Sequence, residues 1–105
     1  MALQLSTHRS GGELTLVVAG VIDLATVDEL ASAITAAVAD DAATSVLVDL
    51  AGVKLLDSAG ISALLKGRRQ AEERGRPYRV TGASGMVAEV LRITGVYNHL
   101  VDDAT

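Results

Sequence analysis

The pattern of apolar and polar positions predicts four strands along the chain. Residues 3–8 alternate weakly, residues 13–19 are apolar with several β-branched side chains, and the glycine pair between them marks a turn. Together these two segments predict a hairpin. A mostly apolar run at 45–50 has the length of a strand and is typical of one buried on both faces. Residues 78–81 form the fourth predicted strand.

Apolar residues at helical spacing predict three helices. The first begins at Thr26, which stands three residues before Glu29 in the spacing of a capping box. The second runs over about 58–74, because the glycine that follows can adopt the left-handed cap and the next proline cannot continue a helix. The third follows Ser84 and ends before Gly95. The apolar stripe of the first helix consists of Val27, Leu30, Ala31, Ile34 and Val38.

The order of these segments, β-β-α-β-α-β-α, determines the expected topology. Strands joined through a helix pair in parallel, whereas the opening hairpin is antiparallel. Each helix has one apolar stripe, so the helices should pack mainly on one face of the sheet. We therefore expect an α/β fold with a mixed sheet of four to five strands, the fifth element falling at 97–101. No linker or repeat interrupts the chain, so residues 1–105 are expected to form a single domain.

Composition narrows the classes of function. Half of the 105 residues are apolar, but there is no Phe or Trp and only two Tyr, so the chain lacks stacking platforms for single-stranded nucleic acid. The net charge of −4 also disfavours binding to a phosphate backbone. There is no cysteine, and no apolar run approaches the roughly 18 residues of a membrane span. We expect a cytoplasmic protein that binds neither nucleic acid nor a membrane.

One serine stands where chemistry could occur. Ser58 precedes a helix, whose N-terminus offers unpaired N–H groups and a partial positive charge to a phosphoryl group. Ala59 and Gly60 add no bulk, which leaves the backbone open to another protein, and Asp57 supplies a neighbouring negative charge. Phosphorylation would add ~1.5–2 negative charges and expel a partner bound to the uncharged form. On local grounds alone, however, the simpler interpretation of Ser58 as a helix N-cap is favoured.

Several segments of the chain together resemble the signature of the STAS domain, in the stand-alone form found in anti-sigma factor antagonists. Five pieces occur in the order of that family, and the resemblance covers residues 3–101. They are VLVDLAGV (46–53), LDSAGI (56–61), Gly20 with Asp23, GRP (75–77) and VLRITG (90–95). The Asp-Ser-x-Gly piece alone is weak, but the order of all five is specific. With this resemblance, the interpretation of Ser58 as a phosphorylation site is favoured over that of a simple helix cap.

The resemblance implies a regulatory function. In that family, an anti-sigma factor with serine kinase activity phosphorylates the residue at the position of Ser58. The unphosphorylated antagonist binds the anti-sigma factor and releases the sigma factor, and a phosphatase resets the phosphorylated form. Asp57 and Asp23 match acidic residues beside that serine, so the expected partner-binding residues are Asp23, Asp57, Ser58, Ala59 and Gly60. ATP, its metal and the catalytic base would belong to the kinase, so we expect no catalytic residue, cofactor or metal site in this chain.

Two departures from the family and two alternative functions stay open. Val21 stands where the family commonly has Glu, and the sequence stops where many members continue with a C-terminal amphipathic helix. One alternative is a constitutive scaffold or sensor component of a larger assembly, with Ser58 only a helix cap. The other is a small hydrolase, which is disfavoured because His8 and His99 are isolated and no base or oxyanion arrangement is evident. A weak homodimer is also compatible with the sequence.

Overall fold

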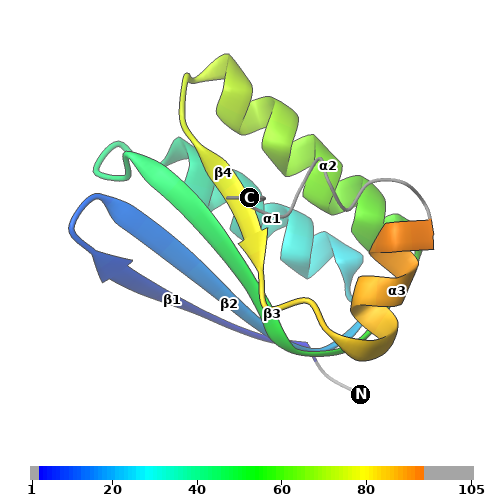
Figure 1. Cartoon of the computed structure of the whole chain (residues 1–105). Coiled ribbons are helices and arrows are strands. Elements are labelled where there is room, and N and C mark those ends of the chain that lie inside the picture. The colour runs from blue at the N-terminus through cyan, green and yellow to red at the C-terminus, as the bar shows by residue number, and fades with distance from the viewer. Residues whose placement is uncertain (1–2, 94–105) are drawn as a thin grey trace.

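The computed structural model describes residues 3–93, which form a four-stranded sheet with its helices on one face (Figure 1). The α/β class, the mixed sheet and the one-sided packing expected from the sequence are confirmed. The element expected at 97–101 and the question of a C-terminal helix lie outside these residues. The elements are β1 (Gln4–Ser10), β2 (Glu13–Ile22), α1 (Val27–Ala39), β3 (Ser45–Leu56), α2 (Ser58–Glu73), β4 (Tyr78–Thr81) and α3 (Gly85–Ile93).

The sheet has the strand order β1-β2-β3-β4, the same as the order along the chain. β1 and β2 pair antiparallel, whereas β2, β3 and β4 run parallel because a helix connects each strand to the next. The carboxyl ends of parallel strands point the same way, so the loops that enter α1, α2 and α3 leave from the same edge of the sheet. We call this the carboxyl edge; it comprises residues 23–26, 57 and 82–84 with the residues that flank them.

The core lies between the sheet and the helices, and it is aliphatic. Alternate residues of β2 and β3 point into it, and the register places Leu16 beside Val48. The expectation that residues 45–50 are buried on both faces is wrong. Leu47 and Asp49 are only half-buried, because within residues 3–93 no helix covers the second face of the sheet. The largest fully buried side chains are Leu16, Ile22, Leu30, Ile34, Leu50, Leu56, Leu64, Leu91, Val18, Val38 and Val46.

β3 continues past residue 50, where the apolar run predicts its end, as far as Leu56. The extension forms because the end of β2 pairs with it, Val21 opposite Leu55 and Ile22 opposite Leu56, after two register shifts earlier in the ladder. The segment that connects the predicted strand to the second helix is therefore a strand itself. This extension carries Ser58 to the carboxyl edge, beside the loop that follows β2.

Gly67, in the middle of α2, is required by packing. A Cβ atom at this position would overlap Ile34 of α1 and lie 2.9 Å from the hydroxyl of Tyr78 on β4. That hydroxyl donates a hydrogen bond to the Leu64 carbonyl at 3.0 Å, and burial raises the pKa of Tyr78 above its ordinary value. Since glycine in a helix costs about 1 kcal/mol relative to alanine, the close approach of α1 and β4 explains why it is found here.

Candidate functional site

Ser58 is the first residue of α2, and the N-cap is its neighbour Asp57. Asp57 has an extended backbone, with φ −98° and ψ −176°, and its Oδ1 accepts a hydrogen bond from the Gly60 N–H at 3.1 Å. Its carbonyl accepts from the Ile61 N–H at 3.1 Å. These bonds satisfy two N–H groups of the first turn, as an N-cap does. The interpretation of Ser58 as a helix cap is therefore wrong, and the serine is not needed to begin the helix.

The Ser58 side chain is exposed, and it makes no hydrogen bond to any other residue between positions 3 and 93. Over the same residues, the backbone N–H groups of Ser58 and Ala59 have no acceptor, whereas those of Gly60 and Ile61 are bonded to Asp57. α2 is 16 residues long, so its N-terminus carries the partial positive charge of a full helix dipole. An exposed hydroxyl thus lies beside two free backbone donors.

Gly60 is buried, whereas the sequence predicts that it leaves the backbone beside Ser58 open to a partner. Its Cα is buried, and a Cβ atom there would overlap Leu56 of β3 and Ile22 of β2. Glycine at this position lets the first turn of α2 pack directly against the ends of two strands. Ala59 is half-buried beside it. The visible role of Gly60 is therefore to set the position of Ser58, through packing, rather than to expose the backbone.

Asp23 belongs to a tightly bonded loop between β2 and α1. Its Oδ1 accepts a hydrogen bond from the Ala25 N–H at 2.9 Å. The buried Thr26 hydroxyl donates to the Val21 carbonyl at 2.8 Å and accepts from the Asp23 N–H at 3.0 Å. The capping box expected between Thr26 and Glu29 is wrong, because Thr26 makes no side-chain cap bond and its hydroxyl closes the loop behind it instead.

A backbone hydrogen bond joins this loop to the start of α2. The Asp57 N–H donates to the Ile22 carbonyl at 3.2 Å, so the residue before Ser58 is bonded to the residue before Asp23. The structure therefore brings Asp23, Asp57 and Ser58 together at the carboxyl edge, although they lie up to 35 positions apart in the sequence. Both carboxylates accept bonds from backbone amides, which holds each side chain in place.

The pattern of apolar residues does not identify three large side chains that the structure leaves exposed. Leu24 is 81% exposed, Met86 60% and Leu55 40%, and they are the exposed large hydrophobic residues of the described chain. Leu24 lies in the loop of Asp23, Leu55 stands three residues before Ser58, and Met86 is the second residue of α3. Two sequence features could have revealed the leucines. Leu24 lies in a loop, outside any apolar stripe, and Leu55 belongs to a Leu-Leu pair in a strand, where alternation turns one of the two side chains outward.

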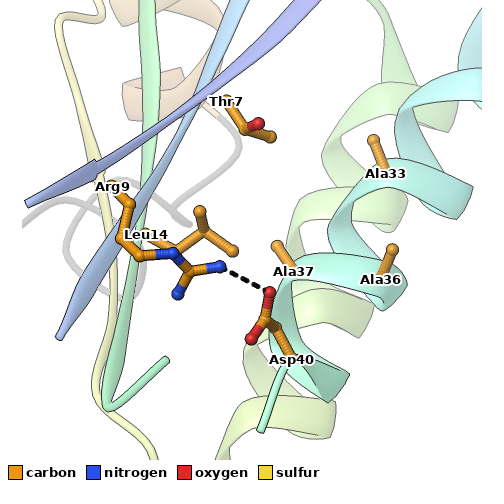
Figure 2. A pocket seen from close by; sticks show the side chains of 7 residues that line it. All are labelled: Thr7, Arg9, Leu14, Ala33, Ala36, Ala37 and Asp40. Atoms are coloured by element: carbon orange, nitrogen blue, oxygen red, sulfur yellow. Dashed lines mark hydrogen bonds and ion pairs between the residues drawn. The ribbon is translucent and has the colours of Figure 1, made fainter. Parts of the chain in front are cut away.

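Away from Ser58, the surface has fewer features that point to a binding site. A hollow of about 220 Å³ lies between the β1–β2 hairpin and α1 (Figure 2), and none of the predicted site residues lines it. Arg9 crosses it to bond Asp40 at 2.7 Å. This bond, with a second from the Ala42 N–H, lowers the pKa of the Asp40 carboxyl below 3.8. No group of three His, Asp or Glu side chains able to hold a metal ion, and no helix able to cross a bilayer, occurs among residues 3–93.

Comparison with known proteins covers nearly the whole chain. A family model described as the Mlab STAS domain matches residues 5–102. No curated protein matches the chain significantly. Among solved structures, an anti-sigma factor antagonist from Mycobacterium paratuberculosis has a TM-score of 0.85 at 23% identity, covering 94% of this chain and 83% of that one.

Two further structures show the same fold. SpoIIAA, an anti-sigma factor antagonist in its unphosphorylated form, has a TM-score of 0.72 at 20% identity, covering 99% of this chain and 90% of that one. The Bacillus cell fate determinant SpoIIAA in its phosphorylated form has a TM-score of 0.71 at 21% identity, covering 99% and 92%. Likeness at these identities establishes the fold, and the family model establishes the family. The chain belongs to the STAS-domain family.

Proposed function

We propose that this protein is an anti-sigma factor antagonist that is switched off by phosphorylation of Ser58. The observation that carries the proposal is the position of the Ser58 hydroxyl, which is exposed at the first residue of α2 while Asp57 caps the helix. A serine without a structural hydrogen bond can be modified without loss of the fold. The fold of SpoIIAA, which has been solved in both phosphorylated and unphosphorylated forms, supports the proposal.

The chemistry requires a partner. The Ser58 Oγ would attack the γ-phosphorus of ATP held by a serine kinase, forming the Oγ–P bond while the bond to the β-phosphate oxygen breaks and ADP leaves. The serine proton passes to a base of the kinase, so this chain acts as substrate rather than enzyme. The new phosphoryl group would lie near the free N–H groups of Ser58 and Ala59 and the positive end of the α2 dipole. A phosphatase would remove the phosphoryl group by hydrolysis, in which water attacks the phosphorus, inorganic phosphate leaves and the Ser58 hydroxyl is restored.

The switch works through charge at the docking surface. Phosphorylation adds ~1.5–2 negative charges next to the Asp57 carboxylate and near Asp23, at an edge that already carries these two acids. A partner that buries this edge when Ser58 is neutral would have to desolvate the added charge. The partner-binding surface in this proposal consists of Asp23, Asp57, Ser58 and Ala59, with Gly60 holding the helix start in position. The protein acts as a single cytoplasmic STAS domain that contacts proteins rather than nucleic acid or membrane.

The test is phosphorylation by purified anti-sigma factor kinases of the source organism. Incubation with the cognate kinase and ATP should add one phosphate, located at Ser58 by peptide mass spectrometry. Ser58→Ala should accept none. Ser62→Ala is the matched control, because Ser62 is also exposed on α2, one helical turn further on, and its loss should change nothing. Incorporation that persists in Ser58→Ala, or no incorporation with any such kinase, would contradict the proposal.

A constitutive scaffold is the second candidate. It is favoured by a match to a much longer protein, Mglu, with a TM-score of 0.63 at 24% identity that covers 71% of this chain but only 18% of that one. The same fold therefore occurs as a part of a larger chain. A scaffold would bind its partner equally well in wild type and Ser58→Asp, whereas the switch requires Ser58→Asp to weaken binding. Titration calorimetry with the purified partner distinguishes the two.

A further inference from the structure

Two exposed leucines flank Ser58. Leu24 is 81% exposed in the β2–α1 loop, and Leu55 is 40% exposed near the end of β3, three residues before Ser58. A single exposed leucine is ordinary on a protein surface. Here the pairing of Val21 with Leu55 and the bond between the Ile22 carbonyl and the Asp57 N–H hold the two leucine-bearing segments together. Both leucines are therefore exposed on segments that meet at the carboxyl edge, where Ser58 also lies.

The loop that carries Leu24 is held in one conformation. Thr26 is buried and bonds both Val21 and Asp23, and the Asp23 carboxylate bonds the Ala25 N–H. Four of the six residues from 21 to 26 therefore take part in these bonds, and Leu24 projects from the middle of them. A side chain presented on a rigid loop loses little conformational entropy when a partner covers it, which is a property of binding anchors.

The charges around the leucines indicate the partner's chemistry. Asp23 and Asp57 stand beside them, and Asp28 and Glu29 are exposed in the first turn of α1, immediately after the loop. Lys54, exposed and directly before Leu55, is the cation on these segments, so four carboxylates against one ammonium group make the border of the leucines mainly acidic. A complementary surface would have an apolar pocket with basic side chains at its rim.

We infer that Leu24 and Leu55 are the anchors by which the kinase partner of the proposed function docks, and that they determine how strongly charge at Ser58 opposes binding. The inference rests on the proposed function. When the leucines are buried in the partner, they exclude water from Ser58. A charge in such a dry contact loses its hydration and opposes binding strongly. Without the leucines the contact stays wet, water solvates the charge, and the switch weakens.

The experiment measures the Kd of four proteins for the kinase that phosphorylates Ser58: wild type, Leu24→Ala, Ser58→Asp and the double variant. Leu24→Ala should weaken binding about tenfold, as loss of an anchor residue does. The factor by which Ser58→Asp weakens binding should be several times smaller in the Leu24→Ala background than in wild type. Leu55→Ala should behave in the same way. Glu73→Ala, at the other end of α2, is the control and should leave the Kd unchanged.

Each outcome decides the inference separately from the proposed function. The inference would be overturned if Leu24→Ala and Leu55→Ala bound the kinase with wild-type affinity. It would also be overturned if Ser58→Asp weakened binding by the same factor with and without Leu24. In both cases the proposed function would stand, provided that Ser58→Asp binds the kinase more weakly than wild type does. Equal binding of wild type and Ser58→Asp would overturn both. Self-association of the protein alone that Leu24→Ala abolishes would assign the surface to a second copy and also overturn it. Thermal unfolding of Leu24→Ala should match wild type, since this side chain contributes little to the core.

Discussion

At the scale of single residues, two neighbours at the start of α2 have different roles. Asp57 accepts hydrogen bonds from two N–H groups of the first turn, whereas the Ser58 side chain contributes no hydrogen bond to the fold. If the serine itself capped the helix, a phosphoryl group on its oxygen would remove the cap as it switched the protein off. With Asp57 as the cap, modification of the Ser58 hydroxyl leaves the cap in place.

This division predicts that alanine substitutions of the two residues affect stability to different extents. Asp57→Ala should lower the free energy of unfolding by about 1 kcal/mol, because the Gly60 N–H loses its acceptor, whereas Asp57→Asn should retain most of the stability. Ser58→Ala should stay within about 0.5 kcal/mol of wild type. Urea denaturation followed by circular dichroism measures all three. A loss in Ser58→Ala as large as in Asp57→Ala would show that the serine does support the helix.

The lowered pKa of Asp40 predicts that the protein loses stability in acid. The pKa of Asp40 in the folded protein lies below the ordinary 3.8, chiefly because Arg9 bonds the charged carboxylate. The folded state therefore binds this proton less readily than the unfolded state. The stabilisation is fully present above pH 3.8 and is lost as the pH falls through the lowered value.

Urea titrations of wild type and Asp40→Asn at a series of pH values, from about 5 down to 2, test this expectation. The wild type should lose more stability over this range than the variant, which has no carboxyl to protonate. Asp41→Asn, one position further along, serves as the control and should follow the wild type, because Arg9 pairs with Asp40 and not with Asp41. Parallel curves for wild type and Asp40→Asn would contradict the assignment.

At the scale of elements, the pattern of apolar and turn residues is enough to predict all seven helices and strands of the described chain. Six of them bury part of one face, whereas β1 is almost wholly exposed and is predicted from its weak alternation and the turn that follows it. The pattern cannot predict how β3 ends, since the last residues of that strand are ordered by pairing with β2 rather than by their own alternation. It also cannot decide between Asp57 and Ser58 as the cap, because both residue types are good caps. The hydroxyl of Thr26 turns back to Val21 because the loop is closed there, which depends on the path of the chain and not on local spacing. The exposure of Leu24 depends on the same path.

The contact between α1, α2 and β4 gives the prediction that belongs to this scale. Gly67→Ala should lower the free energy of unfolding by about 1–3 kcal/mol, because the added methyl group overlaps Ile34 and crowds the Tyr78 hydroxyl. Helix propensity alone would give the opposite sign, a gain of about 1 kcal/mol. Ser62→Ala, at an exposed position of the same helix, is the control and should not destabilise the protein. A stabilised Gly67→Ala in chemical denaturation would show that the packing can relax.

At the scale of the whole molecule, the arrangement would keep the proposed switch at Ser58 local. Ser58 is exposed, its helix is capped by another residue, and the loop of Asp23 is held by its own bonds. None of these has to break when the hydroxyl is modified. The unphosphorylated and phosphorylated structures of SpoIIAA match this chain equally well, with TM-scores of 0.72 and 0.71, so in that relative the two forms keep one fold.

We therefore expect phosphorylation to change the surface of the protein and not its architecture. In amide NMR spectra, shift changes on phosphorylation of Ser58 should be concentrated in residues 21–26 and 55–62, because these segments share the bonds around the site. The β1–β2 turn, at the opposite edge of the sheet, should be unaffected, since charge acts weakly beyond about 10 Å in salt solution. The spectrum of Ser58→Asp should shift in the same segments with smaller amplitude. Changes extending through β1 and β4 would mean that the phosphoryl group alters the packing of the sheet, and partner release would then follow from a conformational change rather than from charge at the docking surface.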